Sequence, residues 1–248
     1  MTPANETHQT TVHLSLQGKG GVGKTLVASI LTQYFRERGI AVHPIDADPV
    51  NHSLAQYKGL EVETLEVLRE GRVDQRCFDG LLERLLTESG QFVIDSGAST
   101  FIPLWYYMLE NHLFDSLRDA GRRIIVHSVI TGGQALADTL SGFGQVAETT
   151  DERSVVVWLN EYFGLIQHDG RNFSEMAVCQ ANHRKLLGSV AIVKRTSDTF
   201  GRDVEEMISS KLTFAEALKS GQFSIMAKQR LKIVRDDLFA QLDATELS

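Results

Sequence analysis

The amino-acid sequence predicts an α/β fold with a doubly wound, mainly parallel sheet and helices on both faces. Short runs rich in Val and Ile recur along the chain, and several lack the polar alternation of a half-exposed strand. Stretches with the apolar spacing of helices separate these runs. The sequence contains no internal repeat, low-complexity segment or linker, so we expect one domain.

The apolar runs place the strands, and the segments between them place the helices. Strands are expected at residues 12–16, 41–45, 92–94, 124–129, 155–159 and 189–193. The first helix is the clearest, because two apolar rows at spacing four run side by side over residues 26–35 and Gly39 follows as a stop signal. Further helices are expected near residues 77–88, 104–119, 133–147, 173–185, 202–219 and 225–242.

The composition is that of a soluble globular chain. The 248 residues are 42% hydrophobic and 23% charged, which is enough apolar material for a substantial core. A net charge of −7 disfavours broad binding to nucleic acid, since surfaces that bind phosphates usually carry a basic excess. Residues 1–10 lack the features of a secretory signal and are expected as a flexible lead-in to a domain at 11–248. With two cysteines and no apolar run of membrane-spanning length, the expected location is the cytoplasm.

A glycine-rich loop after the first strand carries the chemistry. Residues 18–25 read GKGGVGKT, the phosphate-loop pattern, with a strand before it and a helix after it. Glycines let successive N–H groups turn inward, and the helix N-terminus adds partial positive charge, so the loop forms an anion site. Lys24 would reach the β- and γ-phosphates, and the Thr25 hydroxyl would bind Mg²⁺. The expected nucleotide-binding residues of this segment are Gly20, Gly21, Val22, Gly23, Lys24, Thr25 and Leu26.

Carboxylates follow two expected strands at their C-terminal ends, where α/β sheets bind ligands. Asp46 and Asp48 lie in the segment PIDADP. Asp95 ends the run QFVID, a Walker B arrangement that delivers a carboxylate to magnesium. Two structural alternatives stay open, because Asp and Pro commonly form turns and an Asp at a strand end can cap a helix.

The segment KGGVGKT resembles the deviant Walker A motif of the ParA/MinD family of dimerising ATPases, which implies a P-loop NTPase fold. The resemblance implies that Lys19 crosses a nucleotide-sandwich dimer to the phosphates of the other subunit. It also implies that Asp48 orients the attacking water, with Lys19 and Lys24 on the phosphates, and that Asp46 contacts the magnesium shell through water. Asn160 matches an Asn that hydrogen-bonds adenine, and no Asn-Lys-x-Asp guanine motif is present. Where the family has prolines after the Walker B aspartate this chain has SGAS, in which Gly97 can offer its N–H to the γ-phosphate.

Segments from one end of the chain to the other are similar to the TraL family of conjugal-transfer proteins from broad-host-range plasmids. They are LQGKGGVGKT, DADPVN, DSGAS, TGGQALADTLSGF, VVWLN and KQRLKIVRDDLFAQLD. This resemblance, which extends to StbB-type proteins, implies a role in plasmid transfer, stability or positioning inside a bacterial host.

The function expected from these features is an ATP-binding and slowly hydrolysing switch that uses Mg²⁺ and forms a nucleotide-dependent homodimer. Its output would be altered affinity for a plasmid transfer or stability protein. DNA contact is possible but disfavoured by the acidic pI of about 5.6. Membrane binding is disfavoured because three aspartates dilute the basic face of the last helix. The alternatives are an ATP-dependent ligase or kinase for a small molecule, and a nucleotide-binding module without hydrolysis.

Overall fold

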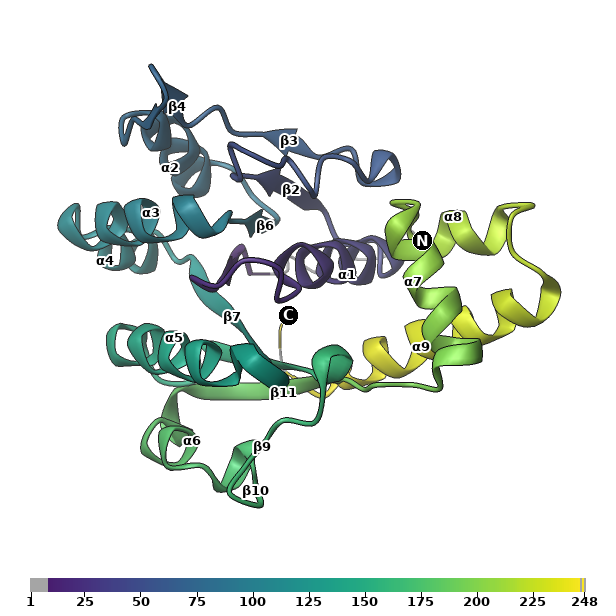
Figure 1. Ribbon diagram of the computed structural model, residues 1–248. Helices are drawn as coiled ribbons and strands as arrows, with labels where there is room; N and C mark the ends of the chain where they lie inside the picture. The colour runs from purple at the N-terminus through teal and green to yellow at the C-terminus, as the bar shows by residue number, and fades with distance from the viewer. Residues whose placement is uncertain (1–8, 246, 248) are drawn as a thin grey trace, which may run out of the picture.

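A computed structural model describes residues 9–245 and residue 247, and a seven-stranded parallel sheet forms its centre (Figure 1). The sheet has the order β11–β8–β7–β1–β6–β2–β3. The bounds of these strands are β1 Thr11–Leu16, β2 Val42–Asp46, β3 Glu63–Thr64, β6 Gln91–Asp95, β7 Arg123–Thr131, β8 Val155–Asn160 and β11 Leu186–Ile192. Every neighbouring pair is parallel, which confirms the predicted α/β class. All residues of β1 are buried, which explains why its run lacks polar alternation.

Helices cover both faces of this sheet. Their bounds are α1 Lys24–Glu37, α2 Cys77–Thr87, α3 Ala98–Glu110, α4 Leu113–Asp119, α5 Leu136–Thr149, α6 Ala177–Ala181, α7 Arg202–Ser209, α8 Phe214–Lys219 and α9 Ile225–Asp243. Figure 1 shows α3, α4 and α5 on one side of the sheet and α1, α7, α8 and α9 on the other. Alternate side chains of β1 pack against the two helix layers. Leu14 packs in the apolar cluster of α2–α4, while the His13 ring lies against Phe35 of α1. The predicted doubly wound arrangement is therefore confirmed.

Two expected helices are divided by positive φ angles. The segment 104–119 forms α3 and α4, with His112 at φ 51° between them, and α3 begins earlier than expected, at Ala98. The segment 202–219 forms α7 and α8, with Lys211 at φ 54° after α7. Residues other than glycine rarely adopt this left-handed backbone conformation. The apolar spacing alone therefore gave no reason to expect a helix to end at His112 or Lys211.

The expected helix at 173–185 is wrong as a continuous element. Residues Phe173–Glu175 form a 3₁₀ turn that starts with a capping box between Asn172 and Glu175. Met176 is extended, α6 covers only Ala177–Ala181, and a second 3₁₀ turn follows. The strand expected at 189–193 is longer and earlier, at Leu186–Ile192.

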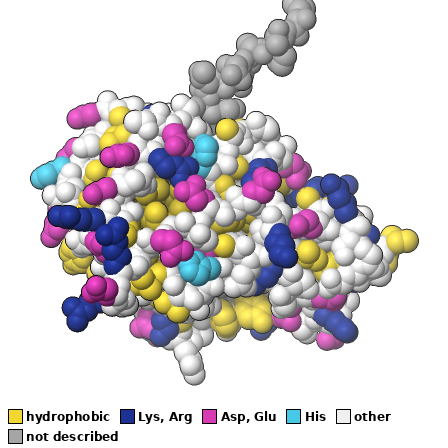
Figure 2. All heavy atoms as spheres, turned by 90° about the horizontal axis from the view of Figure 1, so that it is seen from above, with side chains coloured by type: hydrophobic (Ala, Val, Ile, Leu, Met, Phe, Trp, Pro, Cys, Tyr) yellow, Lys and Arg dark blue, Asp and Glu magenta, His cyan; other side chains and the backbone are white. Residues whose placement is uncertain are grey.

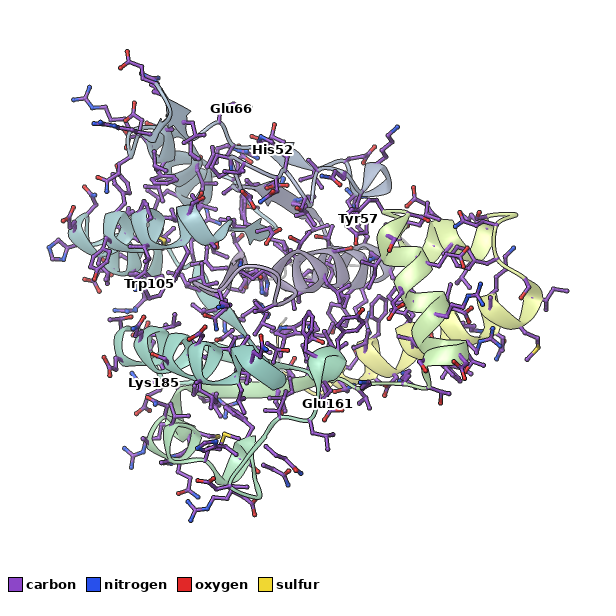
Figure 3. The ribbon with its side chains drawn as sticks, in the orientation of Figure 1. His52, Tyr57, Glu66, Trp105, Glu161 and Lys185 are labelled. Atoms are coloured by element: carbon purple, nitrogen blue, oxygen red, sulfur yellow. The ribbon has the colours of Figure 1, made fainter. Side chains whose placement is uncertain are left out.

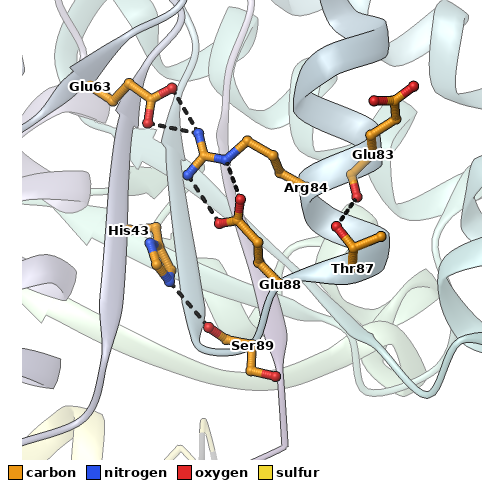
Figure 4. Close-up of polar contacts among 7 residues, drawn as sticks. All are labelled: His43, Glu63, Glu83, Arg84, Thr87, Glu88 and Ser89. Carbon is orange, nitrogen blue, oxygen red and sulfur yellow. Dashed lines mark hydrogen bonds and ion pairs between the residues drawn. The ribbon is translucent and has the colours of Figure 1, made fainter.

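Two hairpins and the edge strand β3 were not expected from the sequence. The hairpins pair β4 (Leu68–Arg69) with β5 (Arg72–Val73) and β9 (Gln167–His168) with β10 (Arg171–Asn172). Their strands are too short to show a period. An ionic network fixes β3 to α2, because the Arg84 guanidinium donates to both oxygens of Glu63 at 2.7 Å and to Glu88 at 3.0 Å (Figure 4).

The start of the chain is only partly described. Residues 1–8 of the expected lead-in lie outside the described residues. Of the other two, Gln9 accepts a hydrogen bond from the Gln91 side chain at 3.0 Å through its carbonyl, and Thr10 accepts one from the Arg123 N–H at 3.1 Å. These two residues therefore extend the contacts of β1 with β6 and β7.

Candidate nucleotide-binding site

The phosphate loop lies between β1 and α1, at the C-terminal edge of the sheet. Gly21 and Gly23 have φ angles of 75° and 111°, which is the left-handed region that glycine adopts without strain. The Lys24 ammonium donates to the Lys19 carbonyl at 3.0 Å, and its side chain therefore spans the cup of the loop. Lys24 is only 7% exposed. Burial lowers its pKa, while the charges of Asp95 and Asp48 act in the opposite direction.

Asp95 lies beneath the loop and contacts Thr25. The Thr25 hydroxyl donates to Asp95 Oδ2 at 2.6 Å, while the other carboxylate oxygen, Oδ1, is buried with no hydrogen-bond partner among the described residues. Burial raises the Asp95 pKa to about 7, helped by the charge of Asp46 and opposed by the Thr25 bond. A buried carboxylate oxygen without a partner, next to a hydroxyl, fits the hard oxygen donors that Mg²⁺ prefers.

Asp46 shapes the loop that follows β2. Its Oδ1 accepts the N–H of Asp48 at 2.9 Å, and its Oδ2 accepts the N–H groups of Leu54 and Ala55 at 2.8 and 3.0 Å. The side chain is fully buried. Both oxygens of Asp46 therefore accept hydrogen bonds from the backbone. The sequence indicated a place near magnesium for this residue but not this structural role.

Asp48 and Gly97 join the two loops that flank the site. A Cβ at position 97 would lie 2.6 Å from Asp48 Cγ, so the Asp48 carboxylate rests on a surface that only glycine provides. Partial burial acts to raise the Asp48 pKa, but hydrogen bonds from the Val50 N–H and from Asn51, together with the Lys24 charge, lower it. Asp48 is therefore an ionised acceptor at neutral pH.

Asn160 ties the end of β8 to the phosphate loop. Its amide donates to the Val22 carbonyl at 2.9 Å and its oxygen accepts the Tyr162 N–H at 3.2 Å. A Cβ at Gly23 would lie 2.9 Å from the same amide nitrogen, so the close approach depends on glycine. The structure thus brings Asn160 to the loop and gives its side chain a supporting contact there.

Lys19 points across the loop to the start of α5. Its ammonium lies 2.8 Å from Asp138 Oδ2, and the two side chains are 49% and 57% exposed. Sequence reasoning missed Asp138, because it comes from a segment remote from the phosphate loop. It also missed Gln17, whose amide donates to the carbonyls of Val129 and Thr139 at 3.1 Å and so anchors the loop to β7 and α5. Spacing in the sequence provided no signal for either residue.

A largely apolar cavity of about 360 Å³ opens beside the end of β8. Its apolar walls come from β11, α7, α9 and the turn before α7, and include Ile192, Val193, Phe200, Val204, Ile208 and Leu238. Tyr162 lies at its edge, and Arg195 pairs with Asp237 at 2.6 Å on its rim. Glu161, labelled in Figure 3, follows Asn160 directly and accepts the Lys194 N–H at 3.4 Å, which links β8 to the chain after β11.

Comparison with known proteins identifies relatives that bind nucleotides. A family model described as the CobQ/CobB/MinD/ParA nucleotide binding domain matches residues 15–230. A TraL protein of Escherichia coli is 43% identical over 234 residues, covering 94% of this chain and 97% of that protein. An uncharacterized ATP-binding protein of Methanocaldococcus jannaschii is 46% identical over 50 residues, which is 20% of this chain.

A solved structure shares this fold. A chain of the MinC:MinD cell division complex of Aquifex aeolicus superposes with a TM-score of 0.53 at 15% identity, covering 97% of this chain and 98% of that one. At this identity the likeness concerns the fold alone. The matched family model, the identity to TraL along nearly the whole chain and the shared fold agree with one another. The chain therefore belongs to the CobQ/CobB/MinD/ParA family of nucleotide-binding domains and, within it, to the relatives of TraL.

Proposed function

We propose that this protein is an ATP-dependent molecular switch that hydrolyses ATP slowly to ADP and phosphate. The observation that carries the proposal is the convergence of Lys24, Thr25, Asp95 and Asp48 at one edge of the sheet, although they come from three segments of the chain. A cationic cup, a hydroxyl–carboxylate pair and an ionised acceptor are the parts that phosphoryl transfer to water requires.

Thr25 and Asp95 are the residues that would hold Mg²⁺, since their oxygens already meet and Asp95 Oδ1 has no other partner among the described residues. When bound, the ion would neutralise the charge that develops on the phosphates. No group of three or more His, Cys, Asp or Glu side chains in the described part of the chain could hold a metal ion. Nucleotide oxygens and water would therefore complete the shell, as is usual for Mg²⁺, with Asp46 acting at most through water.

Asp48 would orient the attacking water. Its carboxylate is ionised at neutral pH and lies within the field of Lys24. Because it rests on Gly97, a γ-phosphate that bound the Gly97 N–H would also change the position of Asp48. The loops after β2 and β6 touch through these two residues. Binding of the γ-phosphate would therefore change the shape of the surrounding surface, as a molecular switch requires.

Lys19 would act in the partner subunit of a nucleotide-sandwich dimer. Half of its side chain is exposed, and its ion pair with Asp138 is a surface contact that a phosphate could replace. Phosphate oxygens carry more charge than a carboxylate, so the exchange favours the dimer only when a triphosphate is present. Lys19 and Lys24 would then act on the same phosphates from opposite subunits.

The base of the nucleotide would lie beside Asn160 and enter the mouth of the 360 Å³ cavity. The apolar walls suit the faces of a purine, and the second amide hydrogen of Asn160 is left for its edge. We assign adenine, since the relative from Methanocaldococcus jannaschii is described as ATP-binding and no guanine motif is present.

The setting we propose is plasmid conjugative transfer, stability or positioning, which rests on the relationship to TraL. The output would be altered affinity for another transfer or stability protein. Figure 2 shows a face on which basic and acidic side chains are interspersed, an arrangement that disfavours broad binding to DNA. Three leucines of α9, Leu231, Leu238 and Leu242, are buried against the domain. Ile225, Met226 and Ile233 of the same helix are exposed. In the described residues, no helix has the length and apolar character to cross a membrane.

Titration calorimetry and size measurement test this proposal. Wild-type protein should bind Mg-ATP, and an Asp48→Ala variant should accumulate as a dimer in saturating ATP because it cannot turn the nucleotide over. Lys24→Ala should lose nucleotide binding, whereas Lys19→Ala should keep binding and lose the dimer or turnover. Absence of any binding of magnesium-loaded purine triphosphates to folded protein would refute the switch.

The same measurements separate the alternatives. A ligase or kinase would show rapid ATP consumption that depends on an added small molecule. A module without hydrolysis would bind Mg-ATP but release no phosphate in a single-turnover assay.

A further inference from the structure

Four polar side chains cross the buried layer between the sheet and α1 in one unbroken line. The Trp158 indole donates to His127 Nδ1 at 2.9 Å, His127 Nε2 lies 3.0 Å from His13 Nδ1, and His13 Nε2 lies 3.0 Å from Gln91 Oε1. Trp158, His127, His13 and Gln91 are all fully buried. They come from β8, β7, β1 and β6, which are consecutive in the sheet. The function proposed above uses none of these side chains.

The direction of every hydrogen bond in this line is determined by its first member. An indole N–H can only donate, so His127 Nδ1 accepts and the His127 proton lies on Nε2. His127 then donates to His13 Nδ1, which places the His13 proton on Nε2 as well, and His13 donates to the Gln91 carbonyl oxygen. Gln91 in turn donates to the Gln9 carbonyl at 3.0 Å. Each histidine is thus neutral with a single tautomer, and the low pKa of both rings, caused by burial, agrees with this.

The line runs diagonally across the sheet toward the edge that carries the site. Gln91 is the register partner of Thr11, His13 of Ile125 and His127 of Val156. Each member therefore lies one same-face position further toward the C-terminal edge than the member before it. The last, Trp158, stands one same-face position before Asn160, which bonds the Val22 carbonyl of the phosphate loop. Diagonal neighbours are within reach of aromatic side chains, so the contacts depend on this register.

A shift of any one of these strands would break the line. A shift by one residue would turn the side chain to the other face, and a shift by two would leave a buried donor or acceptor without its partner. Apolar side chains of similar size would fill the space without this dependence on direction and register. The same strands deliver Asp95 from β6, the phosphate loop from β1 and Asn160 from β8.

We propose that His13 and His127 are positioning residues for the nucleotide site, acting with Trp158 and Gln91 as a register lock. The lock sets how far β6, β1 and β8 project at the C-terminal edge, and so how Asp95, the phosphate loop and Asn160 meet. This inference concerns the placement of the proposed nucleotide site, and its first test does not depend on nucleotide binding.

The first test is the tautomer of each ring in the wild-type protein. Long-range ¹H–¹⁵N correlation spectra of the histidine-labelled chain should show both His13 and His127 protonated on Nε2. Trp158→Phe removes the donor that orients the line and should let the His127 ring populate the Nδ1-protonated form. An Nδ1 proton on either ring in the wild type would overturn the proposal.

The second test separates positioning from general stability. His127→Gln retains an acceptor and a donor, whereas His127→Leu is of similar size and has neither. We expect His127→Leu to remain folded by circular dichroism and to bind Mg-ATP on the order of tenfold more weakly, with His127→Gln within about twofold of wild type. A folded His127→Leu protein with unchanged affinity would overturn the proposal. If the leucine variant does not fold, the affinity of Trp158→Phe decides in its place. Failure of the wild type to bind any nucleotide refutes the proposed function, whereas the tautomer result judges the register lock independently.

Discussion

Replacement of Asp138 by asparagine should strengthen the proposed nucleotide-dependent dimer. In the isolated chain Asp138 pairs with Lys19 at 2.8 Å, and this pair has to break before Lys19 can reach a partner's phosphates. Both side chains are about half exposed, so solvent screens the pair and it contributes roughly 0.2–1 kcal/mol. A symmetric dimer breaks two such pairs, which amounts to about 0.4–2 kcal/mol. The dissociation constant of the dimer should therefore fall by roughly 2- to 30-fold.

Sedimentation analysis in saturating Mg-ATP measures this effect, with Asp48→Ala in the background so that nucleotide persists. Asp115→Asn is a matched control, because Asp115 forms a similarly exposed pair with Arg118 at 3.1 Å on α4, away from the phosphate loop. The gain should shrink as salt rises, since screening already weakens the pair in the free chain. An Asp138→Asn dimer no tighter than that of Asp115→Asn would refute the reasoning, as would a gain that persists after Lys19→Ala.

Three further predictions follow from the buried groups and from the contact between the loops. Asp95→Asn should raise the Tm of the nucleotide-free protein at pH 8 in calorimetry, because the buried carboxylate, with a pKa of about 7, is charged at that pH and destabilises the fold. The same variant should abolish magnesium-dependent binding. An unchanged Tm would contradict the buried charge. In that variant the contribution of His13 to the free energy of unfolding should fall by roughly 2–3 kcal/mol as the pH drops from 6.5 to 4, because the unfolded chain protonates this ring below pH 6.5 while the folded ring gains its proton only near its pKa of about 4. His127 adds to the same trend, and urea titrations with and without His13→Gln should differ by this amount. Gly97→Ala should slow single-turnover hydrolysis about a hundredfold, because the new Cβ would lie 2.6 Å from Asp48 Cγ and displace it, and normal turnover in that variant would argue against a role for Asp48.

The phosphate loop and the strands beneath it could be predicted because each is a local property of the chain. Glycines at positions 21 and 23 are needed for backbone angles that the structure confirms as left-handed. The run ending at Asp95 lacks polar alternation because β6 is buried on both faces. Parallel strands end at a common edge, so the residues at their tips could be expected to meet.

The finer form of the helical segments could not be predicted with the same success. Apolar spacing continues through His112 and Lys211, where the backbone turns into the left-handed region and a helix ends. Nothing in the pattern separates these residues from exposed positions within a helix. One local signal was overlooked, because Thr213 and Glu216 form a capping box that starts α8. Packing adds a hydrogen bond from the Phe214 N–H to the side chain of Gln33 on α1.

The sequence by itself determined the fold class, the phosphate loop and the carboxylates at the strand tips, because period, glycine placement and strand ends are written in neighbouring residues. Only the tertiary structure decided how these parts are held: Lys19 on Asp138, Asp48 on Gly97, and the line from Trp158 through both histidines. Each of these contacts joins segments far apart along the chain. Hydrogen bonds and ion pairs form over about 3 Å, and only the packing of the folded chain brings such distant residues to that separation.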